Sequence, residues 1–256
     1  MPRPWPGGRS QGPNGDRHAG ILLRCQPRDP LDRLALDLTD PLAGNLQPGA
    51  DRFESVLSPI IHPVTKPDYD AVSRAVENFE AAFAPVAFLV NNAGWDRAAN
   101  FLDTTPDFWR KIVAINLFGP LNMNHVVLRG MAARGFGRVV HIASDAGRVG
   151  SSGEAVYSAC KGGIIAFTKT VARELVGKGV ILNTVCPGPT DTAILRSFLE
   201  GPEGARIAEA LKRAIPMRRL GVPEDYPGLI AFLLSDDAAY MTGQTISVSG
   251  GLTMHG

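Results

Sequence analysis

The stretch from Ser144 to Lys161, SDAGRVGSSGEAVYSACK, constrains this chain more than any other part of it. Tyr157 and Lys161 are four residues apart, so they share one face of a helix. A lysine ammonium beside a phenol favours the phenolate, and the pair predicts a tyrosine whose lowered pKa makes it a usable acid or base. Ser144 follows the apolar run 139–143, which predicts a hydroxyl at the carboxyl end of a strand, where open α/β sheets bind ligands. The alternative interpretation is a surface tyrosine–lysine pair on an amphipathic helix.

Three further motifs surround this stretch and are weak when taken singly. They are Asn91-Asn92-Ala93-Gly94 after a strand expected over 85–90, Asn116 within VAINLFG in a helix expected over 107–131, and Pro187-Gly188-Pro189-Thr190-Asp191-Thr192 after a strand expected over 180–185. Alone, the first and third indicate turns, and the second indicates an exposed helical asparagine. The remaining apolar spacing predicts strands over 138–143 and 245–248, and helices over 70–83, 207–214 and 223–235.

In order and spacing, these motifs together with Ser144 and Tyr157-x-x-x-Lys161 resemble the short-chain dehydrogenases/reductases, from about Asp68 to the C-terminus. The resemblance implies one domain over 1–256, a Rossmann-like α/β fold with a doubly wound parallel sheet and helices on both faces. It also implies an NAD(P)-dependent oxidoreductase that interconverts a secondary alcohol and a ketone. The segments SDAGRVGSSGEAVYSACKGG, NTVCPGPTDTAILRS and ISVSGGLTMHG look closest to family members that act on a hydroxyacyl-CoA thioester.

The resemblance assigns a role to each motif residue. Tyr157 would be the acid/base, Ser144 would hydrogen-bond the developing alkoxide, and Lys161 would lower the tyrosine pKa and hold the nicotinamide ribose. Asn116 would bend its helix and extend the proton path through a bound water. The expected cofactor-binding residues are Asp37, Asn91, Ala93, Gly94, Tyr157, Lys161, Pro187, Gly188, Thr190 and Thr192. The segment 189–215 would be the substrate lid, and the protein would be a homotetramer.

Residues 1–67 are atypical for this family, because eleven of the twenty prolines fall there and prolines interrupt helices and central strands. The nearest candidate for the family's phosphate-binding turn is Gly8-x-x-x-Gly12-x-x-Gly15, which follows PRPWP rather than a strand. Its spacing is one residue off the family's, so chance is the main alternative to phosphate binding. A divergent or misread first βαβ unit is equally compatible with this composition.

The prediction of cofactor preference depends on Leu34-Ala35-Leu36-Asp37, which resembles the family's second strand. A carboxylate at its end accepts hydrogen bonds from both ribose hydroxyls and repels a 2′-phosphate, which favours NAD(H) over NADP(H). The alternative is that Asp37 and Asp40 are ordinary loop aspartates. Among basic residues, Lys212, Arg213, Arg218 and Arg219 form a cluster that either meets a CoA phosphate or is a solvated face.

Composition excludes several other classes of protein. A net charge of about +1 with mixed signs does not favour nucleic acid, and no apolar run is long enough to span a membrane. The three cysteines form no C-x-x-C motif and the start lacks a signal-peptide core, which predicts a cytoplasmic protein. The five histidines show no metal-ligand spacing, so we expect no bound metal. A folded but non-catalytic oligomer partner with an impaired cofactor site remains the rival hypothesis.

Overall fold

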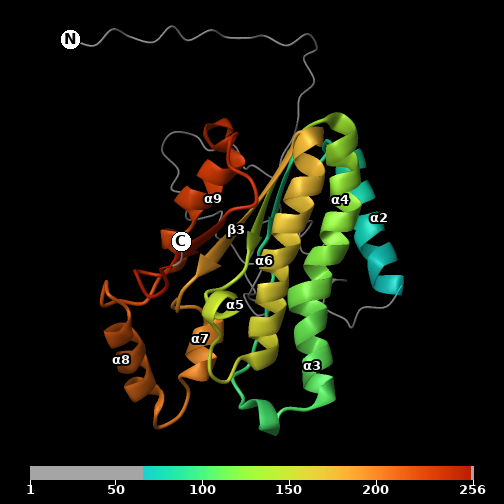
Figure 1. Cartoon of the computed structure of the whole chain (residues 1–256). Helices are drawn as coiled ribbons and strands as arrows, with labels where there is room; N and C mark the ends of the chain where they lie inside the picture. Colours follow the sequence, from blue (N-terminus) through green and yellow to red (C-terminus); the bar gives the residue numbers. More distant parts are fainter. Residues whose placement is uncertain (1–65, 255–256) are drawn as a thin grey trace, which may run out of the picture.

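The computed structural model describes residues 66–254, which form one α/β unit around a central sheet (Figure 1). Strands β1 (Phe88–Asn91), β2 (Gly137–Ile142), β3 (Val180–Pro187) and β4 (Thr245–Val248) lie in that order and are all parallel. The predicted Rossmann-like parallel sheet is therefore confirmed. The Gly8–Gly15 turn, the run 34–37 with Asp37, and the rest of the atypical segment lie outside the described residues, apart from Lys66 and Pro67 at the start of the first described helix.

Helices cover both faces of this sheet. The α-helices are α2 (Lys66–Ala82), α3 (Pro106–Val113), α4 (Gly119–Arg134), α5 (Ala146–Val149), α6 (Ala155–Leu175), α7 (Ala193–Phe198), α8 (Gly204–Ala214) and α9 (Pro227–Leu234). Short 3₁₀ turns are η3 (Phe101–Asp103), η5 (Val176–Lys178), η6 (Pro223–Asp225) and η7 (Asp236–Ala238), and η4 (Ala114–Phe118) is a π-helical turn. Within the described range, no helix is long and apolar enough to cross a membrane.

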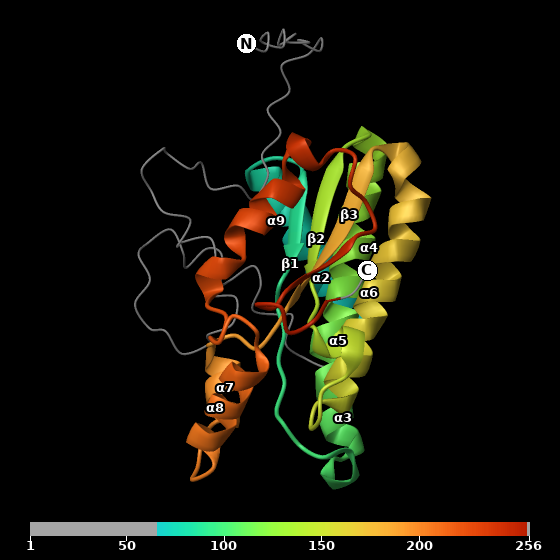
Figure 2. The same ribbon diagram turned by 60° about the vertical axis from the view of Figure 1, so that its left-hand side comes forward.

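The strands alternate their apolar side chains between two cores, because successive residues of a strand point to opposite faces. Leu89, Val139 and Leu182 pack in a core with residues of α2, α4 and α6. Val140 and Val185 face the other side, where α9 packs over them. Figure 2 shows this arrangement, with α9 on one side of the sheet and α4 and α6 on the other. Runs such as 139–142 are thus buried on both faces, which explains why they are continuously apolar apart from His141.

Three boundaries differ from the sequence prediction for identifiable reasons. The strand expected over 85–90 begins only at Phe88, because the backbone of Val86 is bonded by side chains: it accepts from Arg134 and donates to Glu80. The helix expected over 223–235 is divided into η6 and α9, with Pro227 at the first helical position, where its missing N–H costs nothing. Phe83, expected on the buried face of α2, lies just beyond the helix and is 66% exposed.

The buried sides of the two long helices also differ from the prediction. The apolar spacing of α6 predicts a buried set at 159, 164, 165, 167 and 171, and of these only Ile164 is buried. The other buried positions of α6 are Cys160, Lys161, Thr168 and Ala172. The helical segment 106–134 similarly buries Asn116 and Asn124 together with Ile112, Pro120, Val127, Leu128 and Met131. Polar residues occupy the buried sides of these helices because they find hydrogen-bond partners inside the protein. A pattern of apolar residues cannot reveal such partners.

One of these buried polar groups links β2 to both helices. His141 Nδ1 lies 2.8 Å from Thr168 Oγ1, and Asn124 Nδ2 lies 2.8 Å from His141 Nε2. The amide nitrogen can only donate, and Thr168 in turn donates to the carbonyl of Ile164, so the imidazole is neutral with its proton on Nδ1. Complete burial lowers the pKa of His141 to about 3, with the nearby Lys161 charge acting in the same direction.

We expect this histidine to make the fold acid-sensitive. Between about pH 6.5 and 3 the unfolded chain binds a proton at His141 that the folded protein does not, so stability falls as the pH is lowered through that window. The limiting slope is about 1.4 kcal/mol per pH unit for one group. Urea unfolding at pH 7.5 and 5.5 would measure it, with His141→Gln expected to have a shallower dependence and the exposed-site control His125→Gln to match the wild type. Equal slopes in all three proteins would contradict this origin.

Candidate active site

The carboxyl ends of β1, β2 and β3 bring the sequence motifs to one edge of the sheet, as parallel strands require. Asn91 ends β1, Ser144 follows β2, and Pro187 ends β3. The backbone N–H of Asp145 donates to the carbonyl of Pro187 at 3.0 Å, which fixes the segment carrying Ser144 against β3. In both ribbon views the helices α7 and α8 lie at this same end of the molecule as α3 (Figures 1 and 2).

Ser144 and Tyr157 meet at this edge, although one follows a strand and the other lies in the first turn of α6. The Ser144 hydroxyl accepts a hydrogen bond from the backbone N–H of Ala146 at 3.1 Å, which orients its oxygen. The same hydroxyl donates to the phenol oxygen of Tyr157, and this bond lowers the tyrosine pKa. The two residues that the sequence predicts as proton donor and alkoxide partner are therefore adjacent.

The net effect of the surroundings on Tyr157 is opposite to the prediction. Burial raises the pKa of the phenol above its usual value, and the negative charges of Glu154 and Asp96 add to this. The Lys161 Nζ instead donates to the backbone carbonyl of Ile142 at 2.9 Å and lies 5.4 Å from the centre of the Tyr157 ring. The surroundings of Tyr157 thus favour the protonated form of its phenol.

Lys161 itself is buried and electrostatically perturbed. Lys161 is only 3% exposed, and loss of hydration lowers the pKa of its ammonium to about 8. The nearby Cys160, Cys186 and Asp96 act in the opposite direction and raise this pKa. A buried ammonium that makes only one hydrogen bond with a described residue retains two further N–H donors for a ligand.

Asn116 joins the helical layer to the loop that follows β1. Its side-chain amide donates to the carbonyls of Trp95 at 2.7 Å and Ile112 at 2.9 Å, and its Oδ1 accepts from the backbone N–H of Trp95. The helix passes through the π-helical turn η4 at this residue, in agreement with the predicted local distortion. A Cβ on Gly94 would lie 3.1 Å from Asn116 Oδ1 and 3.5 Å from Lys161 Nζ, so only glycine allows the loop to approach this closely.

The segment after β3 uses its hydroxyls locally. Thr190 Oγ1 donates to the carbonyl of Gly188 at 2.8 Å and contacts the phenol of Tyr226, while Thr192 caps α7 by accepting from the N–H of Leu195. Gly188 lies so close to Ser249 that a Cβ would approach it to 2.8 Å. The predicted cofactor residues Pro187, Gly188, Thr190 and Thr192 therefore lie in a turn that is held by local hydrogen bonds.

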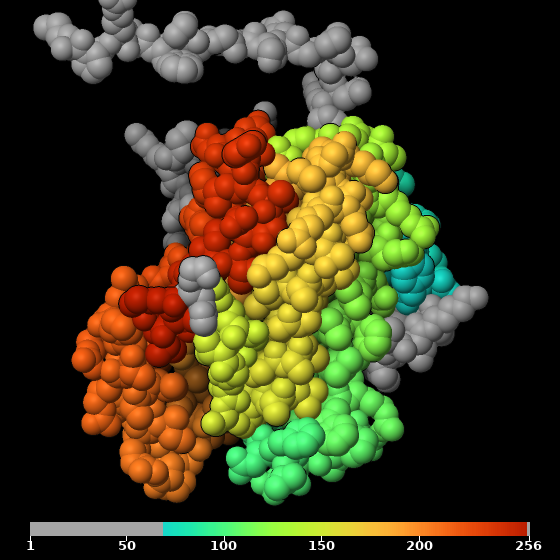
Figure 3. Space-filling view, in the orientation of Figure 1, coloured from blue at the N-terminus to red at the C-terminus, as the bar shows by residue number. Residues whose placement is uncertain are grey.

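The segment predicted as a lid, 189–215, contains two helices rather than the single predicted one. Figure 3 shows α7 and α8 as a distinct lobe beside the residues around α5. The basic cluster is engaged locally: Lys212 pairs with Glu209, Arg219 binds Asp225 through two bonds, and Arg213 and Arg218 bond to backbone carbonyls. These contacts favour the solvated-face interpretation over a phosphate site.

Of the remaining predicted residues, Ala93 is exposed, and Asn91 carries a buried amide nitrogen without a hydrogen-bond partner. Among the described residues this nitrogen has no partner, and only the backbone of Asn91 pairs with β2, opposite His141. A buried donor without a partner, three residues before Gly94, suits the binding of a polar ligand.

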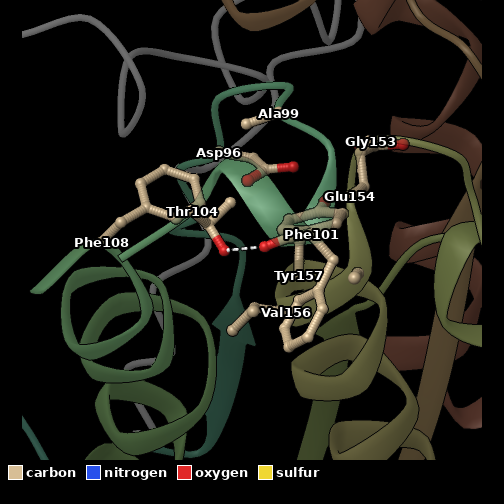
Figure 4. A pocket seen from close by; sticks show the side chains of 10 residues that line it. Asp96, Ala99, Phe101, Thr104, Phe108, Gly153, Glu154, Val156 and Tyr157 are labelled. Carbon is tan, nitrogen blue, oxygen red and sulfur yellow. Dashed lines mark hydrogen bonds between the residues drawn. The ribbon is translucent and has the colours of Figure 1, made fainter. Parts of the chain in front are cut away.

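Two acidic residues at the site were missed by sequence reasoning. Asp96 and Glu154 line a pocket together with Tyr157, Phe108, Ala99, Phe101, Thr104, Gly153, Ala155 and Val156 (Figure 4). Asp96 lies two residues after Gly94 and Glu154 precedes Tyr157 by three residues, so their places close to the motifs were the available signal. Elsewhere in 66–254, no three acidic, histidine or cysteine side chains are arranged to hold a metal ion.

Comparison with known proteins extends the sequence argument. A family model described as enoyl-(acyl carrier protein) reductase matches residues 35–253. The recognisable motifs begin at about Asp68, but this match begins further upstream and includes most of the run 34–37.

Curated relatives match over about three quarters of their own length. The chain is 42% identical to the acetoacetyl-CoA reductase of Shinella zoogloeoides over 183 residues, which cover 72% of this chain and 74% of that protein. It is 42% identical over 192 residues to the acetoacetyl-CoA reductase of Rhizobium meliloti (74% and 78% covered), and 34% identical over 187 residues to the 3-oxoacyl-[acyl-carrier-protein] reductase FabG of Escherichia coli (73% and 75% covered). The parallel sheet, the motifs at its carboxyl edge and these relatives agree: the chain belongs to the short-chain dehydrogenase/reductase family and is an NAD(P)-dependent oxidoreductase acting on CH–OH groups.

Proposed function

We propose that this enzyme interconverts a 3-oxoacyl thioester and the corresponding 3-hydroxyacyl thioester, with a coenzyme A thioester as substrate. The observation that carries the proposal is the group formed by Ser144, Tyr157 and Lys161 at the carboxyl edge of the sheet, where Tyr157 is held protonated. The curated relatives named acetoacetyl-CoA reductase support the thioester. The sequence resemblance to 2-hydroxycyclohexanecarboxyl-CoA dehydrogenase supports it too, since that name also describes a hydroxyl one carbon away from the carbon bearing the thioester.

In this proposal, Tyr157 supplies the proton for reduction. A nicotinamide cofactor, when bound, would supply or accept the hydride at the substrate carbon. As the ketone oxygen becomes an alkoxide, the Ser144 hydroxyl donates a hydrogen bond to it, and Tyr157 transfers its proton to it. An alkoxide is a much stronger base than a phenolate, so a tyrosine with a raised pKa is a competent donor in this direction. Oxidation follows the same path in reverse.

The cofactor would be held by residues that already form a suitable surface. The buried partnerless Nδ2 of Asn91, the close approach allowed by Gly94 and the two spare donors of Lys161 fit a polar dinucleotide, so these residues would bind it. Pro187, Gly188, Thr190 and Thr192, with Ala93, are proposed to complete this surface. Asn116 is proposed as a positioning residue, because it holds the backbone of Trp95 next to Gly94.

The preference for NAD(H) over NADP(H) remains part of the proposal and depends on Asp37. We expect purified protein to reduce acetoacetyl-CoA with a higher kcat/KM for NADH than for NADPH, because a carboxylate repels a 2′-phosphate. Asp37→Ser should shift the ratio towards NADPH by about tenfold or more, the effect of about 1.4 kcal/mol. Asp40→Ser is the matched control and should leave the ratio unchanged. A preference for NADPH in the wild type, or an unchanged ratio in Asp37→Ser, would contradict the assignment.

The same assay separates the enzyme from the rival hypothesis of a non-catalytic oligomer partner. NADH fluorescence on mixing is expected to increase with a micromolar midpoint for a working cofactor site. Failure both to bind NADH and to reduce acetoacetyl-CoA would favour the rival. A cytoplasmic homotetramer without nucleic-acid or membrane partners remains the expectation for its assembly and location.

A further inference from the structure

The pocket beside Tyr157 contains a buried carboxyl group that the reaction described above does not use. Asp96 is 5% exposed, and its Oδ2 is buried without a hydrogen-bond partner among residues 66–254. Its other interactions include the backbone N–H of Arg97, which donates to the carboxyl, and a hydrogen bond with the Glu154 side chain. Figure 4 shows the Asp96 carboxyl pointing into the space between Phe108 and Glu154. An unpartnered buried oxygen is costly, so a group that binds there recovers that cost.

Apart from Glu154 and Tyr157, the pocket wall offers few polar groups besides Asp96. Ala99, Phe101, Phe108 and Val156 are apolar there, and the Thr104 hydroxyl already uses its proton. It donates to the carbonyl of Phe101 at 2.6 Å, drawn in Figure 4, and accepts from the indole N–H of Trp109 at 2.6 Å. Such a pocket has room for a single small polar atom directed at Asp96 rather than for a whole acyl chain.

The surroundings determine whether Asp96 can donate as well as accept. Burial is the largest effect and raises the pKa of Asp96 to about 7, Glu154 raises it further, and the Arg97 N–H and the charge of Lys161 lower it. The titratable or charged groups facing it are Glu154 from the loop before α6, Tyr157, Cys160 and Lys161 from α6, and Arg97 from its own loop. Near neutral pH, a substantial fraction of Asp96 therefore carries a proton and offers an O–H donor.

The proposed substrate has an acceptor that needs such a donor. In a 3-oxoacyl or 3-hydroxyacyl thioester the thioester carbonyl is always separated by one carbon from the reacting carbon. Tyr157 and Asp96 line the same pocket, so a substrate whose reacting oxygen is held by Ser144 and Tyr157 would direct this second carbonyl towards Asp96. Resting on the proposed function, we propose that protonated Asp96 donates a hydrogen bond to the thioester carbonyl of the substrate. Before the substrate binds, the Asp96 proton is donated to the carboxylate of Glu154.

The consequence is a substrate preference that depends on pH. Below about pH 7 the neutral acid binds the carbonyl, whereas above it the carboxylate offers only acceptors and repels the carbonyl oxygen. The pocket also disfavours a free 3-oxo acid, whose carboxylate would lie beside Asp96 and Glu154. Recognition of the thioester thus comes from the acyl group itself, next to the reacting carbon.

The test compares KM for acetoacetyl-CoA between pH 6 and 8.5 in the wild type, Asp96→Leu and Asp96→Asn. Asp96→Leu removes the donor and should raise KM at pH 6 by about tenfold or more. Asp96→Asn retains an N–H donor that does not titrate, so its KM should stay within about threefold of the wild type at pH 6 and remain flat. The wild-type KM should rise by at least about tenfold from pH 6 to 8.5. Asp103→Leu removes an exposed carboxylate on the nearby turn η3 and should match the wild type throughout.

NADH-binding fluorescence in each variant verifies that the fold and cofactor site are intact. An unchanged KM in Asp96→Leu, or an equal increase in Asp96→Asn and Asp96→Leu, would overturn the inference. A wild-type pH dependence that persists in Asp96→Asn would overturn it as well, because a purely structural role predicts that result. If the wild type does not reduce acetoacetyl-CoA at all, the proposed function fails, and that outcome is distinct from normal turnover that is insensitive to Asp96.

Discussion

Replacing Tyr157 with phenylalanine is expected to lower kcat for acetoacetyl-CoA reduction by at least about 100-fold, the usual contribution of a general acid. The ring keeps its place in α6, while the proton donor is lost together with the hydrogen bond from Ser144. NADH affinity, measured by fluorescence, should change by less than about threefold, because the Lys161 ammonium remains bound to the carbonyl of Ile142. Steady-state kinetics measures the loss directly.

The matched control is Tyr240→Phe, since Tyr240 is fully exposed and its hydroxyl makes no hydrogen bond with any described residue. It should retain wild-type kcat. Activity of Tyr157→Phe above about a tenth of the wild type would exclude Tyr157 as the proton donor. A comparable loss in Tyr240→Phe would show instead that removing any tyrosine hydroxyl disturbs the protein.

Replacing Gly147 with alanine is expected to produce the second largest loss of kcat/KM, because it displaces α6, the helix that carries Tyr157 and Lys161. A Cβ at Gly147 would lie 2.6 Å from the backbone carbon of Lys161, 2.7 Å from the nitrogen of Gly162 and 2.8 Å from the Lys161 Cβ. Two of these atoms are backbone, so α5 and α6 must move apart. A displacement of about 1 Å at a catalytic group can cost about 100-fold in rate, and overpacking of this kind costs about 1–3 kcal/mol of stability.

Gly163→Ala is the control. Gly163 lies in α6 itself, and a Cβ there would contact only the flexible end of Leu117 at 3.4 Å. We expect Gly163→Ala to stay within a few-fold of wild-type kcat/KM, whereas Gly147→Ala loses about two orders of magnitude and unfolds at lower urea concentration. Wild-type kinetics in Gly147→Ala would show that α5 can shift without moving Lys161 or Tyr157.

Much of the described fold follows from local sequence patterns. The strand at Thr245–Val248 begins and ends where the apolar run predicts, and the runs after Gly137 and Gly179 become β2 and β3 with small changes at their ends. β2 and β3 are predictable because strands buried on both faces are rich in apolar residues and are bounded by residues that turn the chain. The buried stripe of α6 was not predictable in the same way, because Lys161 and Thr168 are buried through hydrogen bonds formed with distant segments.

Motif order and spacing are properties of the chain alone, so they were enough to predict the family, the parallel sheet and the candidate site residues Ser144, Tyr157, Lys161 and Asn116. Only the tertiary structure decided how these residues act on one another. It turns the Lys161 ammonium towards the carbonyl of Ile142, and burial is the largest effect on the pKa of Tyr157. It also brings Asp96, from the loop after β1, against Glu154 at the start of α6. Burial and through-space charge depend on which segments pack together, and no local pattern of residues records that packing.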